Sequence, residues 1–92
     1  MSAVAPEITA NFAKEYNTTD NITCSAKGVP DPRVTWTHVA GDMDKAMRGL
    51  TGTKEAVLMN LKSGTHTWLC TATNEIGTDS ENVTFTGVFF SF

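Results

Sequence analysis

The chain has 92 residues and a formal net charge of −3, and its seven lysines and arginines are scattered along the sequence. Nucleic acids, anionic lipids and heparin-like polymers need a basic patch or stripe, so this charge pattern argues against all three as partners. No stretch approaches the 18 or more apolar residues of a membrane span, so direct membrane insertion is not expected, and residues 1–5 carry no signal-peptide pattern.

We expect residues 1–5 to be an N-terminal lead or tag, with any signal peptide or membrane anchor outside the chain. A chain this short buries only about 60–65% of the surface of its unfolded form, so its core alone is marginal. Two cysteines, Cys24 and Cys70, permit one disulfide and leave no thiol over. Closing the loop between them would stabilise the fold by about 4 kcal/mol, which is close to the whole stability of a small domain.

Short runs rich in Thr, Val, Ile and aromatic residues alternate with Gly, Pro, Asn and Asp clusters, which is typical of an all-β sandwich. The first clear strand is predicted at residues 21–26 and the next at 33–37. Pro30 and Pro32 interrupt the ladder between them, because proline cannot donate a backbone hydrogen bond. Alternation points five residues of these two strands into the core: Ile22, Cys24, Ala26, Val34 and Trp36.

The pattern is weaker in the middle of the chain, where Gly41-Asp42 and Gly49 are turn signals. We expect one weak strand near residues 47–51, with a short helix at 43–47 as the competing interpretation. Residues 55–61 form a clear strand in which either Ala56 and Leu58 or Val57 and Met59 could point inward, and we predict Ala56, Leu58 and Leu61 as its core residues. The same register would leave two apolar residues on the outer face, which hints at a partner surface or at packing on a sheet edge: Val57 and Met59.

The last two predicted strands cover residues 65–74 and 80–87 and form a hairpin through Asn74-Glu75-Ile76-Gly77. Asn74 and Gly77 suit a turn that needs positive φ, which Asn tolerates and Gly adopts freely. The hairpin adds five predicted core residues: Trp68, Cys70, Ala72, Val83 and Phe85.

Cys24, a tryptophan twelve residues later and Cys70 on the penultimate strand resemble the immunoglobulin superfamily. Gly28-x-Pro30-x-Pro32-x-Val34-x-Trp36 is similar to the strand B to C passage of intermediate-set (I-set) domains, and Cys70-x-Ala72-x-Asn74-x-x-Gly77 to their F to G hairpin. The resemblance implies an antiparallel two-sheet sandwich with Greek-key connections over residues 6–87. It also implies a disulfide from Cys24 to Cys70 that joins the sheets, with Trp36 packed on it.

One motif departs from the family, which usually carries Asp-x-Gly-x-Tyr-x-Cys before the second cysteine, with the tyrosine hydroxyl bonded back to the backbone. Here the chain reads Gly64-Thr65-His66-Thr67-Trp68-Leu69-Cys70. Trp68 therefore occupies the corner position, where only an indole N–H could make the bond.

Three sequons are acceptors for N-linked glycans if the chain is secreted, at Asn17, Asn21 and Asn82. Chance matches in a threonine-rich sequence are the plainer interpretation. Alternation places Asn82 on the outside of the sheet that carries the last two strands. The same outer face should present Thr35, Thr37, Thr67, Leu69, Thr71, Thr73 and Thr84. Such a face could bind a partner, although threonine is also simply a good outward strand residue, and a glycan on Asn82 would obstruct it.

Residues 88–92 form an apolar tail or linker with three aromatic residues. It suits a junction to a following domain, the approach to a membrane span, or a strand that pairs with another copy. His38 and His66 are too few for a metal or triad constellation, so we expect two ordinary strand residues, no catalytic residues, no metal and no cofactor.

The resemblance implies an extracellular module of a cell-surface adhesion molecule or receptor, as in neural cell-adhesion proteins, at the outer side of the plasma membrane or secreted. It would not be an enzyme. Its expected partners are another protein, with a second copy of itself as one option, and neighbouring immunoglobulin-like domains. The alternative is an intracellular sarcomeric or cytoskeletal module of the titin class, in which both cysteines would stay reduced.

Overall fold

The computed structural model describes residues 2–42 and 46–89. These residues contain no helix, and so none that is long and apolar enough to cross a membrane. In chain order the strands of this part are β1 (Val4–Ile8), β2 (Glu15–Asn17), β3 (Ile22–Val29), β4 (Arg33–Ala40), β5 (Arg48–Leu50), β6 (Gly52–Thr53), β7 (Glu55–Met59), β8 (Gly64–Thr73) and β9 (Thr78–Val88).

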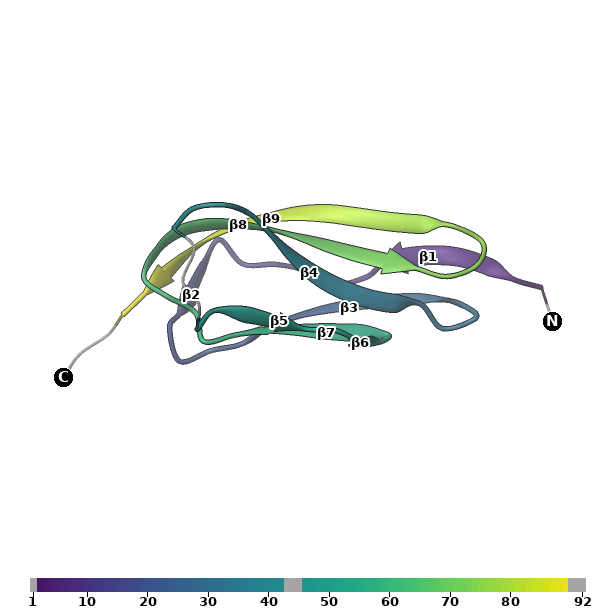
Figure 1. Cartoon of the computed structure of the whole chain (residues 1–92), viewed down its shortest axis with the longest axis horizontal. Coiled ribbons are helices and arrows are strands. Elements are labelled where there is room, and N and C mark those ends of the chain that lie inside the picture. The colour runs from purple at the N-terminus through teal and green to yellow at the C-terminus, as the bar shows by residue number, and fades with distance from the viewer. Residues whose placement is uncertain (1, 43–45, 90–92) are drawn as a thin grey trace.

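The strands form two sheets packed face to face (Figure 1). One sheet has the order β1-β3-β7-β5 and the other the order β2-β9-β8-β4-β6. Every paired strand is antiparallel to its neighbour except β2, which runs parallel to β9. The predicted all-β, immunoglobulin-like sandwich is confirmed.

The core lies between the sheets and follows from strict alternation along the long strands. On β8, for example, every second side chain from His66 to Ala72 is buried. All the predicted core residues are buried: Ile22, Cys24, Ala26, Val34, Trp36, Ala56, Leu58, Leu61, Trp68, Cys70, Ala72, Val83 and Phe85. The structure adds Met47 and the polar His66 to this set.

The weak central strand is present in a shorter form than predicted, as β5. The competing helix at 43–47 falls partly on residues 43–45, which lie outside the described residues. Gly49 is not in a turn but inside β5. A Cβ atom at Gly49 would lie 2.4 Å from Cβ of Trp36, so glycine is required here for close packing rather than for turning the chain.

Three short strands were not predicted: β1, β2 and β6. Each is too short, or too irregular, to show alternation; β1 contains a proline and a register shift between Val4 and Glu7 in its pairing with β3. β1 starts at Val4, inside the expected lead, and β9 runs through Val88, whose partner is Asn17 of β2. The strands therefore extend slightly beyond residues 6–87 at both ends.

Val57 and Met59 lie on the outer face of β7 and are half-buried. Leu50 and Arg48 of β5 are their cross-strand neighbours, so the edge strand covers part of both side chains. Packing at a sheet edge, the plainer of the two interpretations, fits this arrangement.

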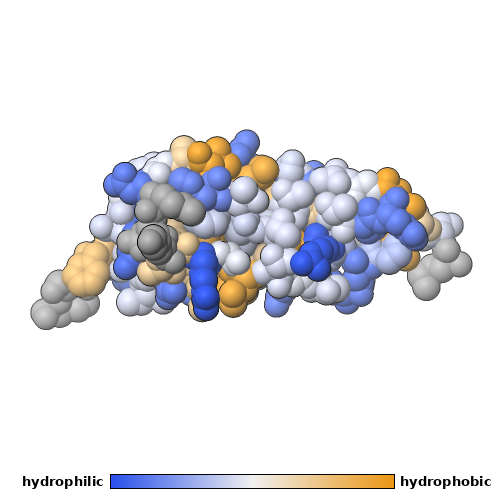
Figure 2. All heavy atoms as spheres, in the orientation of Figure 1, coloured by the Kyte–Doolittle hydropathy of each residue, from blue (hydrophilic) through white to orange (hydrophobic). Residues whose placement is uncertain are grey.

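The molecule is elongated, with extents of 53 × 22 × 18 Å. β1 begins at one end of the long axis and β9 finishes at the other (Figure 1). The surface seen in Figure 2 is mostly white or blue, and its orange areas are small and separate. This side of the molecule therefore presents no broad apolar patch of the kind that marks a permanent interface.

Candidate functional site

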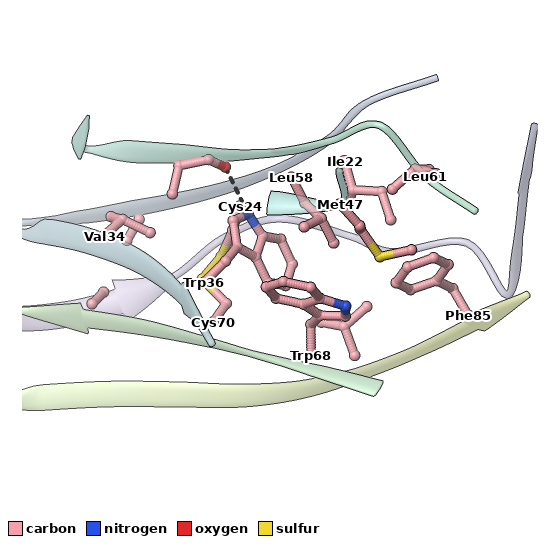
Figure 3. Close-up of a cluster of buried hydrophobic side chains, with 14 residues drawn as sticks. Ile22, Cys24, Val34, Trp36, Met47, Leu58, Leu61, Trp68, Cys70 and Phe85 are labelled. Atoms are coloured by element: carbon pink, nitrogen blue, oxygen red, sulfur yellow. Dashed lines mark hydrogen bonds between the residues drawn. A yellow bond between two sulfur atoms is a disulfide. The ribbon is translucent and has the colours of Figure 1, made fainter. Parts of the chain in front are cut away.

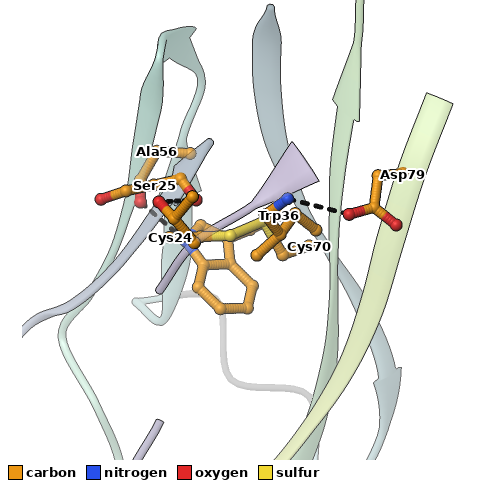
Figure 4. The surroundings of a disulfide bond; sticks show 8 residues. Cys24, Ser25, Trp36, Ala56, Cys70 and Asp79 are labelled. Atoms are coloured by element: carbon orange, nitrogen blue, oxygen red, sulfur yellow. Dashed lines mark hydrogen bonds between the residues drawn. A yellow bond between two sulfur atoms is a disulfide. The ribbon is translucent and has the colours of Figure 1, made fainter. Parts of the chain in front are cut away.

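The centre of the domain is the disulfide between Cys24 of β3 and Cys70 of β8 (Figures 3 and 4). It joins the two sheets with a Cα–Cα distance of 6.6 Å, and neither cysteine is exposed. The Trp36 indole lies against it and donates a hydrogen bond from Nε1 to the backbone oxygen of Ala56, at 3.0 Å. Because Trp36 is on β4 and Ala56 on β7, this bond also ties one sheet to the other.

Trp68 does not close the corner. Its indole is buried, but among the described residues Nε1 has no hydrogen-bond partner. The ring instead meets His38 edge to face, with 5.4 Å between centroids. Trp68 therefore contributes volume to the core and not the backbone bond that a corner tyrosine makes.

His66 is not the ordinary strand residue that the sequence predicts. Its side chain makes a hydrogen bond back to the backbone, of the kind that a corner tyrosine would make. His66 lies near the start of β8 with its ring in the core, only 2% exposed. Nε2 lies 3.1 Å from the backbone oxygen of Lys62 and 3.3 Å from that of Ser63. Both partners only accept, so Nε2 must carry the proton. The bond reaches back three to four residues, as a corner bond does. His66 precedes Trp68 and Cys70 by an even number of residues, and side chains at even spacing in a strand share one face. This spacing is the sequence signal that places His66 in the core.

The hairpin between β8 and β9 turns through residues 74–77, as predicted, but not for the predicted reason. Neither Asn74 nor Gly77 has positive φ. The Asn74 side chain is needed for its hydrogen bonds: Oδ1 accepts from the backbone N–H groups of Ile76 at 2.9 Å and Gly77 at 3.2 Å. Nδ2 donates to the backbone oxygens of Val4 at 2.8 Å and Pro30 at 2.9 Å. One side chain thus holds three separate segments together.

The outer face of β4, β8 and β9 carries the residues predicted for it, and we call it the threonine face. Register pairs define it: Thr35 and Thr37 of β4 face Thr71 and Leu69 of β8. On the other side of β8, Leu69 faces Asn82 of β9. By alternation, the outward residues on the three strands are Arg33, Thr35, Thr37, Val39, Thr65, Thr67, Leu69, Thr71, Thr73, Thr78, Ser80, Asn82, Thr84, Thr86 and Val88.

Paired hydroxyl groups run along the threonine face. Three cross-strand pairs have Oγ1–Oγ1 distances of hydrogen-bond length: Thr65–Thr86 at 3.1 Å, Thr67–Thr84 at 2.9 Å and Thr73–Thr78 at 3.2 Å. Such Thr–Thr pairs are among the contacts that stabilise a sheet. The outward set contains one charged residue, Arg33, and three apolar ones, Val39, Leu69 and Val88, of which Leu69 is the one that faces Asn82.

The three sequons differ in their surroundings. Asn17 is half-buried on β2, and its Oδ1 accepts hydrogen bonds from the backbone and hydroxyl of Thr19, at 2.9 and 2.8 Å. Asn21 is exposed just before β3. Asn82 is exposed in the middle of β9, and its side chain has no hydrogen bond within the part of the chain that the structure describes.

Among residues 2–42 and 46–89, no three His, Cys, Asp or Glu side chains gather in a way that could hold a metal ion. His38 and His66 lie in separate aromatic contacts, one with Trp68 and the other with Phe85. The two histidines are thus used in packing.

The sandwich, the inter-sheet disulfide and the tryptophan packed on it define an immunoglobulin-like domain. The model of the immunoglobulin I-set domain family matches residues 6–86, and the chain belongs to this family. No curated protein matches the chain.

Solved structures similar to this chain include a chimeric titin Z1Z2 functionalized with an exogenous KLER peptide from decorin, with a TM-score of 0.68 and 16% identity, covering 98% of this chain and 100% of that one. The structure of titin domains Z1Z2 in complex with telethonin has a TM-score of 0.67 and 11% identity, and the match covers 98% of this chain and 50% of that one. A structure concerned with Dscam isoform specificity has a TM-score of 0.61 and 20% identity, and the match covers 95% of this chain and 25% of that one. At these identities the likeness concerns the fold.

Proposed function

We propose that this chain is an extracellular recognition module of a cell-surface adhesion molecule or receptor, which binds another protein and catalyses no reaction. The observation that carries the proposal is the buried Cys24–Cys70 disulfide, with no other cysteine in the chain. Disulfides form and persist in oxidising compartments and are rare in the cytosol. The three sequons, all with surface-accessible asparagines, support the same location.

Binding to protein is supported by the family and by one of its structural neighbours, the titin domains solved with telethonin. The long, narrow shape, with β1 starting at one end and β9 finishing at the other, suits a module in a row of domains (Figure 1). At the end where β9 finishes, a hollow is lined by Leu61, Lys62 and Phe89 among others, and Phe89 is 68% exposed. We assign this end to contact with a neighbouring domain, while a second copy of the chain remains a candidate partner for other surfaces.

A structural module of the titin class is the second candidate, and titin domains among the similar structures favour it. The two candidates differ in the state of the cysteines and in glycosylation. The test is an intact mass of the chain from its native source, after alkylation under denaturing conditions without reduction, before and after enzymatic removal of N-glycans.

An extracellular module should resist alkylation and lose mass on glycan removal. Two alkylated thiols and no change on glycan removal would reject the proposal and leave the titin-like module.

A further inference from the structure

The threonine face carries one of the three sequons, at Asn82. We propose that Asn82 bears an N-linked glycan whose first sugar ring packs on Leu69, so that this face is covered by carbohydrate and protein partners bind elsewhere. This inference rests on the proposed extracellular location. It selects one of the three sequons and gives the threonine face an occupant.

The position of Asn82 is the first argument. It lies directly opposite Leu69 across the β8–β9 ladder, and cross-strand neighbours have Cβ atoms about 4.5–5.5 Å apart. The attached sugar therefore begins next to the leucine. The Asn82 amide is free of hydrogen bonds to the described residues, so nothing in the fold has to be broken for it to carry a substituent.

The chemistry of the face is the second argument. A pyranose ring has a C–H-rich face that packs on apolar groups and a rim of hydroxyls that forms hydrogen bonds. Leu69 is the apolar residue of the outward set that faces Asn82, and it is surrounded by hydroxyl groups: Thr67 and Thr71 on its own strand and Thr37 across from it on β4. Each threonine hydroxyl has one donor and two acceptor sites, so even the paired hydroxyls keep sites for a sugar. Arg33, the charged member of the outward set, pairs with Thr73 and not with Leu69 or its neighbours, so no ion has to be desolvated beneath the ring.

The extended strand also places both ends of the sequon on the same face. In β9 successive side chains alternate, so Asn82 and Thr84 lie on the same outer face while Val83 enters the core. Asn17 pairs with Val88 at the end of β9, so a sugar on its Nδ2 would not begin next to Leu69. Asn21 lies at the start of β3 in the other sheet, away from the threonine face.

The modification needs a lipid-diphosphate-linked oligosaccharide as co-reactant. The Asn82 amide nitrogen forms a bond to C1 of the donor sugar while the bond from C1 to the diphosphate oxygen breaks. The amide releases one proton, which water takes up, and the lipid diphosphate leaves with the electron pair. Nothing is oxidised or reduced.

The test is to secrete the 92-residue chain from a glycosylating eukaryotic cell behind a cleavable signal peptide, and to map each sequon by the Asn-to-Asp conversion that enzymatic glycan release leaves. Asn82 should be occupied. Occupancy should be lost in Asn82→Gln and in Thr84→Ala, while the matched control Thr84→Ser should keep it, because serine also completes a sequon.

Packing on Leu69 is tested by the melting temperature before and after glycan release. Release should lower Tm by about 4 °C in the parent chain and by less than about 1 °C in Leu69→Thr, which keeps the sequon but removes the apolar surface. An equal loss in both proteins overturns the packing. An unoccupied Asn82 in a chain glycosylated at Asn17 or Asn21, or in one bearing no glycan, overturns the site; the extracellular location is judged separately by the mass from the native source.

Discussion

Replacing Asn74 with alanine should lower the free energy of unfolding by about 2 kcal/mol. The variant loses four hydrogen bonds, two accepted by Oδ1 and two donated by Nδ2. An intramolecular hydrogen bond contributes about 0.5–1.5 kcal/mol net. Asn74 is only half-buried, so water can replace part of what is lost, and about half of the summed value is expected. In a domain of this size the loss should lower Tm by about 10 °C.

The variant Asn74→Asp separates the contribution of the two hydrogen bonds donated by Nδ2 from that of the two accepted by Oδ1. The carboxylate keeps the acceptor for the turn but cannot donate to the backbone oxygens of Val4 and Pro30, and it places a negative charge beside both. We therefore expect this variant to be at least as unstable as Asn74→Ala. Amide exchange in β1 should be faster in both.

The assay is urea unfolding at equilibrium, with an unchanged m-value showing that the unfolded state is the same. Glu75→Ala is the matched control, an exposed neighbour in the same turn, and should stay within about 0.5 kcal/mol of the parent. If Asn74→Asp were as stable as the parent, the bonds to β1 and to the loop before β4 would contribute nothing, and the reasoning would be refuted.

Three further predictions use the same unfolding assay. Changing Cys24 and Cys70 together to alanine should remove about 4 kcal/mol, and a loss below about 1 kcal/mol would contradict the loop-closure argument. Trp36→Phe should lower the free energy of unfolding by about 1–2 kcal/mol more than Trp68→Phe, because of the two indoles only that of Trp36 donates a hydrogen bond, to a buried backbone oxygen. Equal losses of stability in the two variants would show that ring volume alone matters. His66→Phe keeps a ring in the core but loses the bond to the loop before β8, so it should cost about 1 kcal/mol and speed amide exchange in that loop, whereas unchanged exchange would mean that His66 holds no corner.

The long strands could be predicted from the sequence because each alternates over enough residues to separate its two faces. β8 is the clearest case, since Trp68, Cys70 and Ala72 share one face and the threonines the other. The same alternation placed Asn82 and the threonine face correctly. β2 could not be predicted, because three residues show no period and its parallel pairing with β9 depends on where the preceding chain crosses between the sheets.

The site is less predictable from the sequence, because the role of these residues depends on position more than on residue type. Histidine is usually an ordinary polar strand residue, but the spacing of His66 from Cys70 places it inside. Glycine usually signals a turn, but Gly49 leaves room for Trp36, which only the packing of β5 reveals. Two of the four hydrogen bonds of Asn74 reach residues that are 70 and 44 positions away, and no local pattern encodes contacts of that range.

The covalent link between the sheets also limits how far the domain can be stretched. When the two ends of the chain are pulled apart, the segment between Cys24 and Cys70 stays closed, because its 46-residue separation is bridged by the sulfur atoms. Only the residues outside that loop can unravel, and at roughly 3.3–3.6 Å per residue they can extend to about 150 Å, half the contour length of the reduced chain. In an oxidising environment the domain would therefore act as a short tether with a fixed maximum length, and reduction of a single bond would double its reach.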